Sequence, residues 1–180
     1  TLVPRRWAQS CLPARWRFFK SIMSDKLNHI VATFFYSGKV PHAPGTAGSI
    51  LALLVFYLIR SFVDSYFILA GITFIVFLVG VYVSGKEQEK SGIEDPSFVV
   101  IDEVAGIFLA LLFVSNVSVI NYLIVLALFR FFDITKILFI KRVEGLKGGW
   151  GIMCDDILAG LYAGICFIII SKLFLNKYCI

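Results

Sequence analysis

Residues 66–84 read YFILAGITFIVFLVGVYVS and contain no charged side chain. A helix of about 17–25 apolar residues crosses a hydrocarbon core of about 30 Å, so this stretch predicts a transmembrane helix. Four other apolar stretches are as long or nearly so, at 47–63, 98–115, 119–136 and 156–174. A shorter run at 27–37 cannot span the core. We therefore expect an all-α, polytopic membrane protein with about five transmembrane helices and a short N-terminal interfacial or re-entrant helix.

The composition supports a membrane protein of one domain. The chain has 180 residues and 59% hydrophobic content, above the roughly 45–50% of soluble domains, and its mean hydropathy is +0.87. Of its 17 basic residues, five precede Met23, and the remaining twelve are balanced by twelve acidic residues. The net charge of +5 therefore belongs to the N-terminal extension, and we expect no nucleic-acid partner.

Residues 1–22 hold no acidic residue and mix arginine with tryptophan and phenylalanine. They end just before Met23-Ser24-Asp25-Lys26, which resembles an ordinary protein start. Three interpretations stay open for this segment: translated upstream sequence, a basic surface-lying extension and a targeting segment. A secretory signal peptide is disfavoured, because no apolar run of about 7–15 residues precedes a cleavage site. We treat 1–22 as a basic N-terminal extension, for which a non-native or disordered segment is one interpretation. Residues 23–180 are expected to form a single membrane-embedded domain.

The connections between the apolar stretches alternate in basic charge. Those at 20–46, 85–97 and 136–155 carry several lysines or arginines, whereas 60–65 has one arginine beside an aspartate and 115–121 has no charge. Basic loops stay in the cytoplasm, so the alternation places the N-terminus inside and the C-terminus outside, with five crossings between them. Every polar motif then falls at the cytoplasmic face, where separate segments can form one composite site.

Six carboxylates lie on or beside the ends of apolar segments: Asp95, Asp102, Glu103, Asp133, Asp155 and Asp156. An Asp at a helix centre costs about 2.5–3.5 kcal/mol on insertion scales, so such acids must cluster at an interface, line a wet cavity or bind cations. We take all six as candidate catalytic residues.

Four of these acids are candidate metal ligands. Asp155 and Asp156 are expected to open the last helix, where one Asp could be a cap, but two acids after a glycine run favour a metal site. Asp102 and Glu103 lie about one turn inside the third segment. Hard oxygen ligands of this kind favour Mg²⁺ together with substrate phosphate. Asp95 precedes Pro96, where a loop or turn is the alternative.

Two motifs are candidates for substrate binding. Arg130, Asp133 and Lys136 recur every three residues and share one face of the fourth helix. They could form an intrahelical salt bridge, worth about 0.3–0.5 kcal/mol, or bind phosphate through the cations and a metal through the acid. The spacing leaves both open.

The second motif, PGTAGS at 44–49, leads into a helix and offers free N–H groups to an anion. Its candidate residues are Gly45, Thr46, Gly48 and Ser49. An N-cap role for Thr46 or Ser49 is the alternative.

The remaining polar residues point to packing. The four cysteines show no C-x-x-C pair and no nearby histidine, which argues against zinc and a disulfide framework. His29 and His42 are solitary, and we expect a structural role for His29. Gly160-x-x-x-Gly164 is typical of close helix packing.

Four motifs in this order resemble the bacterial phosphatidylglycerophosphatase A family over residues 28–165. They are Pro41-x2-Pro44-Gly45-Thr46-x-Gly48-Ser49, Asp95-x6-Asp102-Glu103-x2-Gly106, Arg130-x2-Asp133-x2-Lys136 and Gly148-Gly149-x-Gly151-Ile152-Met153-x-Asp155-Asp156-x2-Ala159-Gly160. The resemblance implies a Mg²⁺-dependent lipid phosphatase of the bacterial inner membrane. It would hydrolyse phosphatidylglycerol phosphate to phosphatidylglycerol and inorganic phosphate.

The chain departs from the family pattern at three positions. The family usually has proline after the lysine matched by Lys136, whereas this chain continues with Ile137, so the fourth helix is expected to run further. Phe98 stands at a position that is commonly polar, and His42 has no expected counterpart. None of the acids is lost.

The residues themselves support the same chemistry. Mg²⁺ held by several of the acids would polarise the phosphoryl oxygen and activate water, Asp95 or Asp133 would orient that water, and Arg130 and Lys136 would balance phosphate charge. The phospholipid tails could stay in the bilayer. The alternative from another class is a transporter or channel with a carboxylate cation or proton site, but the acids lie at one interface only. The oligomeric state is left open.

Overall fold

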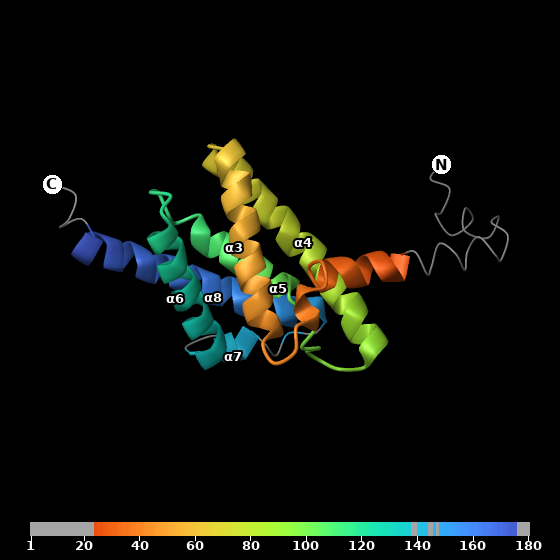
Figure 1. Ribbon diagram of the computed structural model, residues 1–180. Helices are drawn as coiled ribbons and strands as arrows, with labels where there is room; N and C mark the ends of the chain where they lie inside the picture. The colour runs from red at the N-terminus through yellow and green to blue at the C-terminus, as the bar shows by residue number, and fades with distance from the viewer. Residues whose placement is uncertain (1–23, 138–139, 144–145, 147, 176–180) are drawn as a thin grey trace, which may run out of the picture.

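A computed structural model describes residues 24–137, 140–143, 146 and 148–175 (Figure 1). Within these residues every regular element is helical, which confirms the all-α class. A first helix covers residues 24–32. The other elements are η1 (Ser37–Lys39), α3 (Pro44–Phe62), α4 (Tyr66–Ser91), α5 (Ile101–Leu111), α6 (Val119–Thr135), α7 (Ile140–Val143), α8 (Gly149–Ile170) and the π-helical turn η2 (Ser171–Leu175). The expected extension, residues 1–22, lies outside the described residues.

The short helix α5 is the centre of the bundle. It contacts α3, α4, α6 and α8, and Figure 1 shows it in the middle of the molecule, behind α3. Nine of its residues are buried, from Ile101 to Leu111. Beyond its first turn this helix is apolar on all sides, as is typical of a helix inside a protein or a membrane, and here the neighbouring helices cover it.

Glycines bring α5 and α8 into close backbone contact. A Cβ atom at Gly160 would overlap the carbonyl oxygen of Gly106, and one at Gly106 would lie 2.6 Å from the carbonyl oxygen of Asp156. A Cβ at Gly164 would overlap the ring of Phe113. The packing role expected for Gly160 and Gly164 is thus confirmed. This contact also fixes how α8 is rotated relative to α5.

In the part of the chain that the structure describes, three helices are long and apolar enough to cross a membrane: α3, α4 and the helix Gly149–Leu173. The expected count of five is not confirmed. α5 has 11 residues, about 16 Å at 1.5 Å per residue, roughly half of a hydrocarbon core. It is shorter than the apolar stretch because residues 99–100 are not helical and the helix ends at Leu111.

Two helix boundaries differ from expectation. The last helix was expected at 156–174 but begins at Gly149. A Cβ at Gly149 would overlap the carbonyl oxygen of Val81 and lie 2.8 Å from the nitrogen of Gly85. Close contact with α4 therefore offsets the cost of about 1 kcal/mol for a helical glycine. The expected extension of the fourth helix is wrong, because Lys136 takes a left-handed conformation with φ 44° and its N–H bonds to Phe132 O.

The N-terminal apolar run is only partly helical. A helix was expected at 27–37, but it covers 24–32 and gives way to a turn in which Phe34, Phe35 and Tyr36 all have positive φ. The backbone N–H of Val100 donates to Ala32 O at 2.9 Å. The C-terminal end of this helix therefore packs on the connection that leads into α5.

Candidate metal and phosphate site

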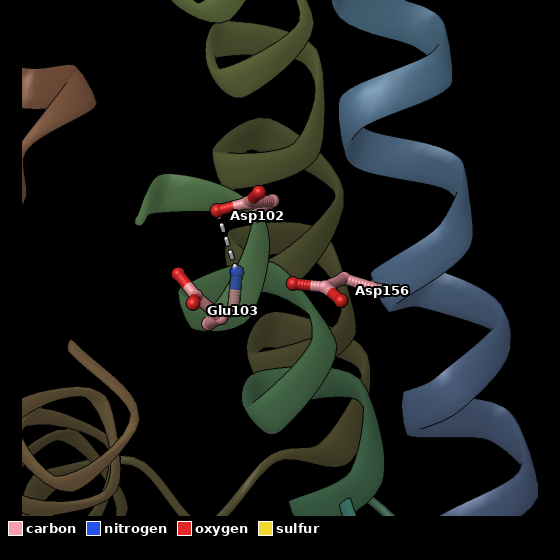
Figure 2. A group of neighbouring side chains, drawn as sticks. All are labelled: Asp102, Glu103 and Asp156. Atoms are coloured by element: carbon pink, nitrogen blue, oxygen red, sulfur yellow. Dashed lines mark hydrogen bonds between the residues drawn. The ribbon is translucent and has the colours of Figure 1, made fainter. Parts of the chain in front are cut away.

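Three carboxylates from two helices face one another and form a group that we call the carboxylate trio: Asp102, Glu103 and Asp156. One oxygen from each lies within 4.8 Å of the other two. Figure 2 shows Asp156 extending from α8 toward the pair on α5. A cation bound at about 2.0–2.6 Å holds its ligands no more than about 4–5 Å apart. The trio therefore has the spacing of a cation site.

The start of α5 orients the first two members of the trio. Asp102 and Glu103 lie in the first helical turn, where backbone N–H groups have no partner within the helix. Asp102 Oδ1 accepts the N–H of Glu103 at 3.0 Å, drawn as a dashed line in Figure 2. This bond holds one oxygen of Asp102 against the backbone and leaves the other for a ligand.

The aspartates of α8 do not cap that helix. Asp155 and Asp156 follow its first turn, which contains no acidic residue, so the cap alternative is wrong. Both residues are buried, at 7% and 4% exposure. A buried carboxylate away from a helix end needs another compensating partner.

The two aspartates have different neighbours. Asp155 accepts a hydrogen bond from Lys136 Nζ at 3.2 Å, whereas Asp156 belongs to the trio. Adjacent helical residues point about 100° apart around the axis, so the two side chains face different groups. Asp155 thus lies beside the trio, and its assignment as a metal ligand stays a prediction.

The structure brings all six predicted acids into one region. Asp95 interacts electrostatically with Asp102 and Asp155. Asp133 interacts in the same way with Glu103 and Asp156. The cations described beside them are Arg130 and Lys136. When ionised, six carboxylates against two cations would leave a local excess of negative charge, which bound cations would compensate.

Arg130 connects α6 to α5. Its NH1 atom lies 2.6 Å from Asp133 Oδ2 and 3.6 Å from Glu103 Oε1, so the intrahelical salt bridge is present together with a contact between helices. Among the described residues, Arg130 Nε and Glu103 Oε2 are buried without a hydrogen-bond partner. Buried polar atoms are normally paired. An unpaired donor and an unpaired acceptor at one site fit an anion and a cation that bind together.

The start of α3 reaches the same site. A Cβ atom at Gly45 would overlap Glu103 Oε1 and lie 3.1 Å from Arg130 NH1, so only glycine lets the backbone approach this closely. The N-cap alternative is wrong, because α3 begins at Pro44 after Ala43 and both Thr46 and Ser49 are helical. The Oγ of Ser49 donates to Gly45 O at 2.8 Å.

Of the predicted substrate-binding residues in this motif, only Gly45 has a described contact with the site. Gly48 and Ser49 are buried, and a Cβ at Gly48 would lie 2.8 Å from Val100 Cβ. Thr46 is exposed. Substrate binding by these three residues stays a prediction.

Nothing in the sequence pattern singles out Glu87 as a functional residue. This residue is 4% exposed, and its Oε2 lies 3.0 Å from His29 Nδ1. It is part of the charged run Lys86-Glu87-Gln88-Glu89-Lys90, which reads as a solvated helix end. The only available signal was the solitary histidine, for which a structural role was expected.

A family model described as Phosphatidylglycerophosphatase A matches residues 30–171. A Haemophilus influenzae protein named Phosphatidylglycerophosphatase A is 38% identical over 138 residues, which cover 76% of this chain and 84% of that protein. The Escherichia coli protein of the same name is 32% identical over 146 residues, covering 78% of this chain and 82% of its own length.

A Bacteroides thetaiotaomicron protein that carries phosphatidylinositol-3-phosphatase as a provisional name is 38% identical over 141 residues, covering 76% of this chain and 88% of that protein. No solved structure matches the chain. The family match spans the trio and both cations, and the named relatives cover most of their own length. The chain therefore belongs to the phosphatidylglycerophosphatase A family, a family of phosphoric monoester hydrolases.

Proposed function

We propose that the protein is a Mg²⁺-dependent lipid phosphatase that hydrolyses phosphatidylglycerol phosphate to phosphatidylglycerol and inorganic phosphate. The observation that carries this proposal is the carboxylate trio beside Arg130, whose Nε atom is buried without a hydrogen-bond partner among the described residues. A phosphate monoester bound to a divalent cation needs oxygen ligands for the metal and a donor for its own oxygens. Family membership supplies the lipid class.

The trio is the natural holder of the metal ion. Its three oxygens are within 4.8 Å of one another, and Glu103 Oε2 is buried without a partner among the described residues, so the donor set fits Mg²⁺. When bound there, Mg²⁺ supplies Lewis-acid activation of the phosphoryl group and of a water nucleophile.

The other charged residues have separate roles in the proposed reaction. Arg130 presents its guanidinium to the phosphate oxygens, because a planar fork can bind two of them at once. Lys136 adds a point charge and positions Asp155 through their 3.2 Å contact. Asp95 or Asp133 orients the attacking water and accepts its proton. The water oxygen would bond to phosphorus while the P–O bond to the terminal glycerol breaks, and the leaving glycerol oxygen would take up the proton to give phosphatidylglycerol.

The location of the site suits a lipid substrate. α3, α4 and α8 have the length and composition of membrane-spanning helices, while the trio lies in the first turn of α5 and about two turns into α8. We place the protein in the bacterial inner membrane with this site toward the cytoplasm, following the charge of the connecting segments. The phosphate group can then enter the site while both acyl chains stay in the bilayer.

The test is phosphate release by the purified full chain in detergent. Phosphatidylglycerol phosphate is supplied with Mg²⁺ or with EDTA, and phosphatidylinositol 3-phosphate is assayed in parallel because of the name of the Bacteroides relative. We expect Mg²⁺-dependent release, faster from phosphatidylglycerol phosphate. Equal release in EDTA would contradict the metal role, and a preference for the inositol lipid would contradict the substrate assignment.

A further inference from the structure

The connection between α4 and α5, residues 92–100, carries Asp95 and leads into the trio residues of α5. The N-terminal segment, residues 24–39, packs against this connection. The N–H of Val100, the residue that precedes α5, donates to Ala32 O at 2.9 Å. A Cβ atom at Gly38 would overlap the carbonyl oxygen of Phe98. The backbone of the N-terminal segment therefore contacts this connection at two points.

His29 links that segment to α4 and to the connection itself. Its Nδ1 lies 3.0 Å from Oε2 of Glu87 near the end of α4, and its ring packs on Phe98 with centroids 5.5 Å apart. The Glu87 side chain is 5% exposed and that of His29 is 27% exposed. The pair thus lies at the point where α4 ends and the connection begins. The unusual Phe98 finds its packing partner in His29.

We propose that His29 and Glu87 are positioning residues that set the placement of Asp95, Asp102 and Glu103 relative to Asp156 on α8. This role rests on the proposed metal-dependent phosphatase. The trio takes its ligands from two helices, so the cation site depends on the height and rotation of the first turn of α5, which the connection sets together with the glycine contact between α5 and α8. Ligand constellations tolerate displacements of only about 0.5 Å.

This role predicts a particular kinetic pattern. The described partners of His29 lie on α4, on the connection and at Tyr36, whereas Arg130 and Lys136 are provided by α6 and its C-cap. Breaking the His29–Glu87 bond should therefore weaken metal binding and lower kcat while the KM for lipid changes little. A loss of general stability would instead lower the amount of folded enzyme without changing the metal affinity of the folded fraction.

The experiment measures Mn²⁺ binding to the full chain in detergent by electron paramagnetic resonance, without lipid, and then Mg²⁺-dependent turnover. We expect His29→Ala and Glu87→Met to weaken Mn²⁺ binding on the order of 10-fold, as for other outer hydrogen bonds at metal sites. Glu87→Met keeps the buried volume, so it serves where His29→Ala does not fold. His29→Asn should keep most of the Mn²⁺ affinity that His29→Ala loses, because the amide N–H of asparagine can replace Nδ1 as the donor to Glu87. Lys26→Ala, an exposed change in the same helix, is the matched control.

Wild-type Mn²⁺ affinity in folded Glu87→Met would overturn the positioning role. The same holds if His29→Asn is as defective as His29→Ala, or if the KM for lipid rises as much as kcat falls. A different result would contradict the proposed function. If wild-type protein binds Mn²⁺ but releases no phosphate from either lipid, the phosphatase assignment is wrong, and the positioning role is then decided by the Mn²⁺ affinities of the variants.

Discussion

Replacing Gly45 with alanine should damage the site without destabilising the fold. The added Cβ would overlap Glu103 Oε1 and lie 3.1 Å from Arg130 NH1. An ordinary carbon–oxygen contact is about 3.3–3.6 Å, so the Glu103 carboxylate must move by on the order of 1 Å. A misplacement of about 1 Å can cost on the order of 100-fold in rate. We therefore expect kcat to fall roughly 10- to 100-fold and Mn²⁺ binding to weaken.

Gly45→Ala should leave the stability of the fold unchanged or raise it. Alanine is favoured over glycine in a helix interior by about 0.8–1.0 kcal/mol, and Gly45 is the second residue of α3, where the same preference holds in weaker form. The atoms that must move belong to the end of a flexible side chain, which limits the strain. The melting temperature of Gly45→Ala should therefore equal or exceed that of the wild type.

Gly71→Ala is the matched control, because it also adds one methyl group to a helix. Nothing lies within 4 Å of the Cβ position at Gly71, which is exposed on α4. This variant should keep wild-type turnover and Mn²⁺ affinity. If Gly45→Ala also keeps wild-type turnover and Mn²⁺ affinity, the Glu103 carboxylate can move without loss of function. Its placement beside α3 would then have no bearing on catalysis.

Three further predictions concern the site and the topology. Replacing any member of the carboxylate trio or Asp155 with its amide should reduce phosphate release by about 100-fold or more; near-normal release from two such variants in folded protein would contradict the metal site. Arg130→Lys should lose about 10- to 100-fold in kcat/KM, since lysine lacks the bidentate fork, while Lys136→Arg should be milder; full activity of Arg130→Lys with a misfolded Arg130→Gln would favour a structural salt bridge. In a cysteine-free background, a cysteine at Ser91 should resist an impermeant thiol reagent in intact cells and one at Asn116 should react; labelling at Ser91 would reverse the orientation.

The helical boundaries show where sequence reasoning stops. The apolar stretches correctly indicated helices near α3, α4 and α6, because apolar length is a local property of the chain. The apolar stretches did not predict where α8 begins. Three glycines between 148 and 151 disfavour a helix on propensity, yet Gly149 is helical because the Val81 backbone lies against it. Contacts with a segment more than sixty residues earlier decided that boundary.

The sequence by itself determined the helical membrane class, the family motifs and the gathering of six acids near one end of the apolar segments, since these depend on composition and order alone. Only the tertiary structure decided which acids share a site. Neighbouring residues on a helix point about 100° apart, so Asp155 and Asp156 leave α8 in different directions. The rotation of α8, set where Gly160 contacts Gly106, directs Asp156 to the trio and Asp155 to Lys136. That rotation depends on packing between distant segments, which no local pattern records.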